Sequence, residues 1–314
     1  MDEWRQISLR VPHWPQPPAL AYHPRGLSLA LGILAPTAAQ RAAMSATTIE
    51  HADGTKIVTD GTVVTQAAGG GEARAVAAPS WLPLESNPEV LNPFVRRMGL
   101  PDGWGFADVF GLDEELLMMV PQPCVALCLL YPSTKISAPR REDLRKREQP
   151  ASHPEGIFFV QQHDEIGNAC GTIAAVHALS NCAAAGAFEL NPGPLATFVE
   201  SVKDKSVGDK GWALANAVEL QELSDETAAA GETEGAGTDD ANDSHFISFV
   251  NLKGSLYELD GRTWDADGNA FPVFHGPTSV ETFVSDAAKV IREDFMARDP
   301  ENYGFNVTAL CKLE

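Results

Sequence analysis

One cysteine of this chain lies among small residues directly before an apolar segment. The stretch from Gln162 to Thr172 contains Cys170 and leads into the apolar run from Ile173 to Leu179. This run predicts a helix that begins at Cys170, where unpaired N–H groups and the positive end of the helix dipole favour a thiolate over a thiol. Small neighbours also leave room for a substrate backbone. The segment therefore indicates a cysteine nucleophile, and the alternative is a thiol that only fills core volume.

A base and an acid that could serve this thiol lie in one segment downstream. From His245 to Asp260, two apolar, β-prone runs flank a turn signal at Lys253 and Gly254. If the loop begins one residue earlier, the histidine and the aspartate face each other directly, with Cβ atoms about 5 Å apart. A turn at Lys253 and Gly254 shifts the aspartate by one diagonal step. Either register brings the two side chains together, and the alternative is a hairpin end with two solvated polar residues.

These segments stand among other motifs in the order found in one known family. The chain resembles the ubiquitin C-terminal hydrolase family of cysteine peptidases, in particular its small single-domain members. The resemblance rests on these segments: Trp81 to Val90, Ala107 to Pro121, Ile166 to Asn181, His245 with Tyr257 to Arg262, Phe271 to Gly276, Asp286 to Val290 and Ala309 to Lys312. So many motifs in the family's order make the resemblance specific.

The resemblance implies an α/β fold of papain-like layout, with a mainly antiparallel central sheet between helices and a crossover loop at the active site. It implies Cys170 as nucleophile, His245 as general base and acid, and Asp260 as the residue that orients the imidazole. The implied activity is removal of small or unfolded adducts from the C-terminal glycine of ubiquitin through an acyl-enzyme, without a metal or organic cofactor. The alternatives are a ubiquitin-binding protein that has lost catalysis and a hydrolase for a ubiquitin-like modifier.

One position departs from the family's pattern. The family places an oxyanion-stabilising glutamine six residues before its nucleophile, and Asp164 occupies that position here. A carboxylate there would repel a developing oxyanion. Read from the N-terminal side, Phe159 to Gln162 matches the family's strand ending in glutamine, and His163 to Glu165 then contains a two-residue insertion. We expect Gln162 to be the oxyanion donor, with the insertion looped outward.

Composition fits one globular enzyme domain that follows an extension. The chain has 314 residues, of which 44% are hydrophobic and 21% are charged. We expect a disordered or targeting extension and linker over residues 1–79 and a catalytic domain over residues 80–314. Five cysteines without a regular framework indicate free thiols in a reducing compartment. Cys124 and Cys128 lie in an apolar run that predicts a buried strand, and no second pair completes a zinc site.

The chain is strongly acidic, with a formal net charge of -20. This charge disfavours nucleic acid, whose phosphates require clustered Lys and Arg, and favours a basic partner. By resemblance, that partner is ubiquitin, and Glu85, Glu89 and Asp108 contact its basic groups. Asn168 is assigned to the same substrate-binding set. The alternative for the three acids is a solvated surface, and we expect the protein to be a monomer.

The first residues contain Pro-rich and Gly-rich segments, from Pro12 to Pro18 and from Gly69 to Gly71. From Arg5 to Thr48 there are four arginines and no acidic residue, so a transit peptide is the alternative to a disordered tail. Met44 is an alternative start. The apolar stretch from Leu27 to Ala39 is shorter than the about 20 residues that span a bilayer. We expect a cytoplasmic location, with the nucleus as a second compartment, and no membrane partner.

Two charged stretches lie outside the catalytic motifs. The stretch from Glu222 to Asp243 contains eight acidic residues and no Lys or Arg, which predicts disorder. Its place directly before His245 matches the family's crossover loop, and the alternative is an inert insertion. The run from Arg140 to Arg147 is interpreted as an exposed loop between a strand and a helix, with a nuclear signal as the alternative.

Three further histidines are weighed as possible partners of the thiol. His177 lies two helical turns beyond Cys170 and is interpreted as a core or supporting residue. His163 would reach the sulfur only if the inserted loop folded back. His275 is interpreted as structural.

Overall fold

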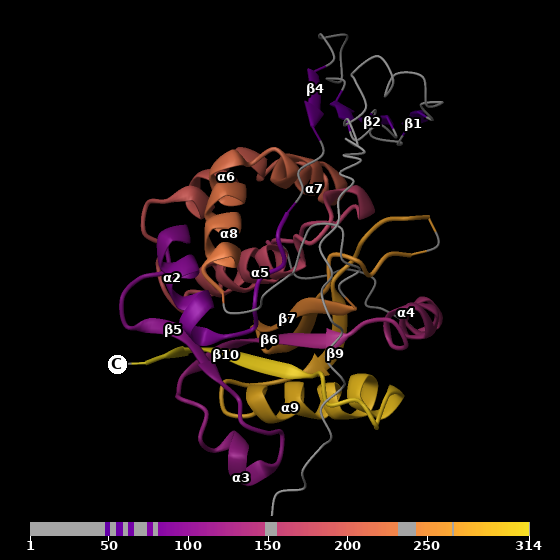
Figure 1. The fold of residues 1–314 in the computed structure, drawn as a ribbon. Coiled ribbons are helices and arrows are strands. Elements are labelled where there is room, and N and C mark those ends of the chain that lie inside the picture. Colours follow the sequence, from indigo (N-terminus) through magenta and orange to yellow (C-terminus); the bar gives the residue numbers. More distant parts are fainter. Residues whose placement is uncertain are drawn as a thin grey trace, which may run out of the picture. The chain divides into compact units, whose positions relative to one another are not determined.

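The computed structural model describes residues 81–147, 156–231, 243–265 and 267–313, together with four short strands that precede them (Figure 1). These strands are β1 Thr48–Glu50, β2 Thr55–Val58, β3 Thr62–Thr65 and β4 Arg74–Ala77. They form an antiparallel sheet in chain order. No strand was expected in this segment, although Thr and Val, which recur there, favour pleated structure. The domain boundary at residue 80 stays a prediction.

A six-stranded sheet organises the region from Trp81 onward (Figure 1). Its order is β5-β10-β6-β7-β8-β9, and every pairing is antiparallel. The strands are β5 Trp104–Asp108, β6 Cys124–Pro132, β7 Ser244–Leu252, β8 Ser255–Leu259, β9 Val273–Pro277 and β10 Asn306–Lys312. This arrangement confirms the expected antiparallel α/β layout.

Helices cover both faces of this sheet (Figure 1). One face carries α2 Pro88–Met98, α5 Cys170–Ala184, α6 Pro194–Val202, α7 Val207–Ala215 and α8 Val218–Ala229. The other carries α9 Phe283–Val290, continued by the π-helical turn η2 Ile291–Phe295 and the 3-10 turn η3 Met296–Arg298. Two further helices are α3 Glu114–Leu117 and α4 Ser137–Lys146. No helix among the described residues is long and apolar enough to cross a membrane.

Alternating strand side chains build two separate cores. On β7, Phe246 and Val250 enter the core on the α5 face, whereas Ile247 and Phe249 enter the core on the α9 face. The helix α5 packs against β6 and β7, and its residues 170–182 are all buried. A helix that is apolar on all sides belongs in the interior. The interaction of Cys170 with the backbone of Phe246 places the first turn of α5 against the start of β7.

The β7–β8 hairpin has the two-residue turn that the sequence predicts. Lys253 and Gly254 have φ values of 53° and 78°, so both occupy the left-handed region that a type I′ turn requires. Leu252 pairs with Ser255 in the resulting register. Asp260 directly follows β8 and therefore lies one diagonal step from His245, which is the second of the two registers considered.

The prediction of disorder is wrong for residues 222–229, because α8 includes them. Leu220, Leu223, Ser224 and Thr227 form a buried stripe at helical spacing. The hydroxyls of Thr172 and Ser224 lie 2.8 Å apart and join α8 to α5. Residues 232–242, the remainder of the expected crossover loop, lie outside the described residues.

The prediction of an exposed loop from Arg140 to Arg147 is also wrong. Residues up to Lys146 belong to α4, in which Arg140 and Leu144 are buried. Pro139 falls in the first turn, where backbone N–H groups have no intrahelical partner, so it does not interrupt the helix. Charge density alone did not indicate this burial, because it depends on acidic partners that are distant in sequence.

Candidate active site

Cys170 is the first residue of α5 and is only 7% exposed. No side chain caps this helix start, so its backbone N–H groups and dipole face the sulfur. Burial raises the pKa of the Cys170 thiol, but interaction with the His245 side chain outweighs it. The backbone of Phe246 and the charge of Arg262 act in the same direction as His245. The net result is a thiol pKa below its ordinary value.

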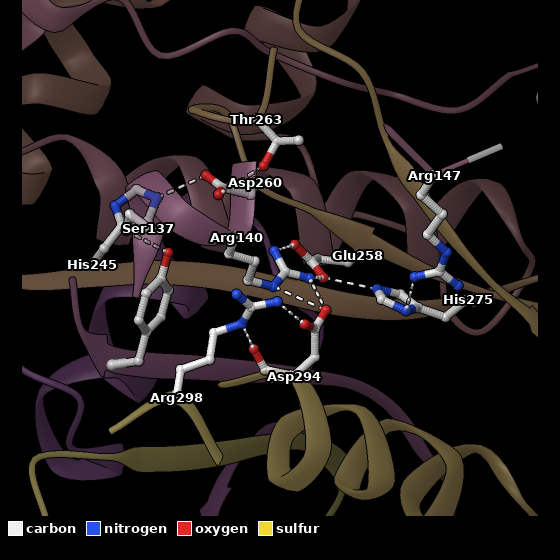
Figure 2. Close-up of polar contacts among 11 residues, drawn as sticks. Ser137, Arg140, Arg147, His245, Glu258, Asp260, Thr263, His275, Asp294 and Arg298 are labelled. Carbon is white, nitrogen blue, oxygen red and sulfur yellow. Dashed lines mark hydrogen bonds and ion pairs between the residues drawn. The ribbon is translucent and has the colours of Figure 1, made fainter. Parts of the chain in front are cut away.

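His245 bridges the thiol and the carboxylate. Its Nε2 donates a hydrogen bond to Oδ1 of Asp260 over 2.7 Å (Figure 2). Its Nδ1 has no hydrogen bond of ordinary length to any described residue, which leaves this nitrogen for the thiol. Burial opposes protonation, but the charge and hydrogen bond of Asp260, together with Cys170, raise the pKa of His245 to about 9. At neutral pH the His245 ring is therefore an imidazolium, with a proton on both nitrogens.

Asp260 is held as a carboxylate. Its Oδ1 also accepts a hydrogen bond from the backbone N–H of Arg262 at 2.8 Å. Its Oδ2 accepts one from Thr263 Oγ1 at 3.0 Å (Figure 2). Burial opposes ionisation, but the positive charge of His245 and these donors keep the pKa of Asp260 well below its usual value. The role of Thr263 was not predicted from the sequence. A hydroxyl three residues after Asp260 could have indicated a donor to its carboxylate, because so short a separation keeps the two side chains close.

Gln162 is fully buried beside the segment that follows Asp260. Its backbone N–H donates to the carbonyl of Gly261 at 2.8 Å, and its Nε2 donates to the carbonyl of Gly167 at 2.9 Å. A Cβ atom on Gly261 would lie 3.0 Å from both Gln162 N and Val160 O, so this close approach favours glycine. The amide of Gln162 therefore lies between the Asp260 segment and the turn before Cys170.

The inserted residues form a single turn, η1 Asp164–Ile166. The side chain of Asp164 is exposed there, in contrast to that of Gln162. His163 does not fold back to the sulfur: its ring stacks on Trp212 at 3.9 Å, and its Nε2 donates to the carbonyl of Gly208 at 2.9 Å.

The remaining substrate-binding candidates lie at three places. Glu89 is exposed in the first turn of α2, and Asp108 is exposed at the end of β5. Glu85 is half-buried, and its carboxylate lies within 3 Å of the position that a Cβ on Gly231 would take. Asn168 is half-buried in the turn that leads to Cys170.

The other cysteines lie in the cores and form no metal site. A register shift between Leu310 and Cys311 on β10 lets Cys124 join the core on the α9 face, whereas Cys128 joins the core on the α5 face. Two cysteines on opposite faces of one strand cannot bind the same ion. Among the described residues, no group of three His, Cys, Asp or Glu could hold a metal. Burial raises the pKa of Cys128 to about 12.

His177 is a core residue, as predicted. Its Nε2 accepts a hydrogen bond from the N–H of Val160 at 2.8 Å, and its Nδ1 donates to the carbonyl of Leu259 at 3.3 Å. Burial lowers the pKa of His177 to about 4, so it stays neutral. It thus ties α5 to the strand end from which Asp260 projects.

Cys170, His245 and Asp260 together form the arrangement of a thiol hydrolase on a papain-like α/β fold. Comparison with known proteins defines the class more closely. The family model of ubiquitin carboxyl-terminal hydrolase, family 1, matches residues 81–297. The chain belongs to this family of cysteine peptidases.

Individual relatives align with this chain over almost their whole length. The chain is 41% identical to a ubiquitin carboxyl-terminal hydrolase of Aplysia californica, over 70% of this chain and 97% of the relative. It is 40% identical to one of Drosophila melanogaster, over 75% and 99%. Isozyme L1 of Homo sapiens is 38% identical, over 73% and 97%. The fold also resembles the Trichinella spiralis UCH37 catalytic domain solved with ubiquitin vinyl methyl ester, with a TM-score of 0.58 and 22% identity over 74% of this chain and 95% of that one.

Proposed function

We propose that this chain is a deubiquitinating thiol hydrolase that removes small or unfolded adducts from the C-terminal glycine of ubiquitin. One observation carries the proposal: Cys170 begins α5 and interacts with the side chain of His245, whose Nε2 is held by Asp260 at 2.7 Å. With a pKa raised to about 9, the His245 ring is an imidazolium at neutral pH, and it lowers the pKa of the Cys170 thiol. This favours the thiolate, which is the nucleophile of a cysteine peptidase. Membership of the family supplies ubiquitin as the substrate.

The geometry supports a two-step mechanism. The thiolate of Cys170 attacks the carbonyl carbon of the terminal glycine, and the imidazolium of His245 gives its proton to the departing amine, which leaves a thioester. The neutral imidazole then takes a proton from water, and the hydroxide formed attacks the thioester. Release of the ubiquitin carboxylate restores the thiolate and the imidazolium. Asp260 holds the imidazole in one orientation throughout.

The described surface offers acidic and apolar groups for a basic partner. Asp108 lines a cleft of about 590 Å³ together with Phe110 and Phe305. The side chain of Phe110 is 73% exposed, and exposed apolar groups rimmed by charge are typical of protein-binding sites. We assign Asp108, Glu89 and Glu85 to contacts with basic groups of ubiquitin, and Asn168 to its C-terminal tail.

An electrophilic ubiquitin probe tests the proposal, because it labels only a competent thiolate. The wild-type protein should form a covalent adduct that is absent in Cys170→Ser. A matched probe built on a ubiquitin-like modifier should react much more slowly. No labelling by the ubiquitin probe, with ubiquitin binding retained, would instead indicate a binding protein that has lost catalysis. Faster labelling by the second probe would indicate a different modifier as substrate.

Charge reversal tests the surface contacts separately. Asp108→Lys and Glu89→Lys should raise KM for a fluorogenic ubiquitin adduct, with kcat nearly unchanged, because rim charges mainly steer association. The effect should shrink at high salt. A Lys substitution at exposed Glu301 serves as the matched control.

A further inference from the structure

The arginines of α4 contact the segment that carries Asp260. Arg140 binds the side chain of Glu258 on β8. Arg141 donates to the carbonyl of Arg262 at 3.4 Å, and its guanidinium lies 4.6 Å from the Trp264 ring. Arg145 donates to the carbonyl of Trp264 at 3.2 Å. The basic run that the sequence left without a function is therefore a clamp on the polypeptide to either side of Asp260.

The strongest contact of this clamp is the buried ion pair of Arg140 and Glu258. Two parallel hydrogen bonds of 2.7 and 2.6 Å join them, and the side chains are 3% and 0% exposed (Figure 2). His275 donates to the same carboxylate at 2.8 Å, and Asp294 accepts from Arg140 Nε at 3.1 Å. A two-pronged pair of this kind fixes the direction of both side chains, which a lysine could not do.

This pair reaches Asp260 through the strand. Glu258 precedes Asp260 by two residues. The ion pair of Arg140 and Glu258 therefore fixes β8 directly before the carboxylate that holds the imidazole. On the C-terminal side, Arg141 and Arg145 hold the next residues by their carbonyl groups. Asp260 thus projects from a backbone that α4 contacts both before and after it.

A second route reaches His245 through aromatic rings. The guanidinium of Arg140 lies 4.0 Å from the ring centre of Phe295, and that ring lies 5.0 Å from Tyr131. The Tyr131 ring meets the imidazole of His245 edge-on, with centres 5.7 Å apart. Its hydroxyl is fixed by Ser137 of α4, 3.0 Å away. Helix α4 therefore contacts residues that surround both His245 and Asp260.

Stability alone gives little reason to bury these charges. The desolvation of a buried arginine and glutamate offsets most of their attraction, and apolar residues of similar volume often serve as well. Fixed direction is what the ion pair adds. We propose that Arg140 is a positioning residue, which acts through Glu258 and through Phe295 and Tyr131 to hold Asp260 and His245 in the orientation that faces Cys170.

The inference rests on the thiolate–imidazolium pair of the proposed function, so its test begins with the thiolate itself. Alkylation of Cys170 by iodoacetamide, followed across pH, reports the ionisation of this thiol without any ubiquitin. Cys170→Ser supplies the background from the other cysteines. Arg140→Lys and the double variant Arg140→Met with Glu258→Leu are compared with the wild type, since the apolar pair preserves packing if the lysine variant does not fold. Thermal melting verifies the fold of each.

In both variants the acidic limb of the alkylation profile should move to higher pH by roughly one pH unit, because the imidazolium faces the sulfur less closely. On a fluorogenic ubiquitin adduct, kcat should fall about 10- to 100-fold with KM little changed. Val202→Ala, a cavity in the buried face of α6, is the control for general destabilisation and should lower the melting temperature without moving the profile.

Folded variants with the wild-type profile and kcat would overturn the inference, as would the same shift in Val202→Ala. These outcomes are distinct from failure of the proposed function. If the wild-type thiol ionises only near its ordinary pKa, the proposed function fails and takes this inference with it. If the wild type has the low acidic limb and the Arg140 variants keep it, the inference alone fails.

Discussion

The side-chain amide of Gln162 donates a hydrogen bond to the carbonyl oxygen of Gly167 over 2.9 Å, and this contact closes the turn that contains Asp164. Because Gly167 lies three residues before Cys170, the contact ties the glutamine to the start of α5. The amide has a second N–H, which a developing oxyanion could use. Asp164 is turned to solvent by the same turn.

We therefore expect Gln162→Ala to lower kcat on a ubiquitin fluorogenic adduct by about 10²- to 10³-fold, the usual effect of losing one oxyanion donor. Ubiquitin affinity should change little, because the contact forms only in the transition state. Asp164→Ala is the matched control and should be mild or slightly beneficial. The opposite ranking would mean that the site stabilises the oxyanion with other groups.

Cys170→Ser should abolish turnover while ubiquitin binding persists, because a serine at this helix start is not ionised by His245. Steady-state hydrolysis and calorimetric binding measure the two effects. Cys128→Ser and Cys182→Ser test the assignment from the other side, since both thiols are buried and their pKa values are raised by burial. Either substitution should leave kcat within a few-fold of the wild type, and a complete loss in a folded variant would contradict the assignment.

Stability should depend on pH through His245. The folded protein holds this proton more tightly than the unfolded chain, since the pKa rises from 6.5 to about 9. The resulting stability is complete below about pH 6.5 and is lost as the pH rises through 9. Asp260→Asn removes the main charge responsible. The stability advantage of the wild type over this variant should therefore shrink between pH 6 and pH 9.5, by on the order of 1 to 3 kcal/mol.

Urea unfolding of both proteins at the two pH values measures this difference. Ionisation of Cys128 and Cys182 in the unfolded chain also lowers stability at high pH, because burial raises the pKa of both thiols in the folded protein. It acts on both proteins alike and cancels in the comparison. Parallel pH dependences for the wild type and Asp260→Asn would mean that the carboxylate does not hold the proton on His245.

The chain between Gly231 and Asp243 should limit the size of the leaving group. It joins α8 to β7, which begins one residue before His245. By resemblance to the family's crossover loop, we expect an adduct to pass this segment on its way to the thiol. Inserting a Gly-Ser segment there should raise the rate on folded ubiquitin conjugates relative to small adducts. An insertion of equal length after Gly186, at the end of α5, is the control. An unchanged ratio of the two rates would leave this chain without a gating role.

The positions of Cys170, His245 and Asp260 could be predicted from the sequence because they depend on local structure. The helix start fixes Cys170, and the Lys253-Gly254 turn fixes the register that brings His245 to Asp260. The burial of Arg140 could not be predicted, because its acidic partners Glu258 and Asp294 lie 118 and 154 residues away.

Helix α8 shows a second limit. Its acidic composition predicted disorder, whereas only a narrow stripe centred on Leu220 and Leu223 packs inward. So few apolar residues do not predict a packed helix until the surface that they pack against is known. The stacking of His163 on Trp212 was missed for the same reason.

The position of β10 has a consequence for how the chain acquires its structure. This strand, Asn306–Lys312, is the last of the described sheet, yet it lies between β5 and β6. On a ribosome, β5 has no strand to pair with until residues 306–312 have been synthesised. The β7–β8 hairpin with His245 can form earlier, because its pairing is local. A nascent chain would thus carry His245 and Asp260 in place while β5 and β6 still lack the strand that lies between them, so their unpaired edges stay exposed until late in synthesis.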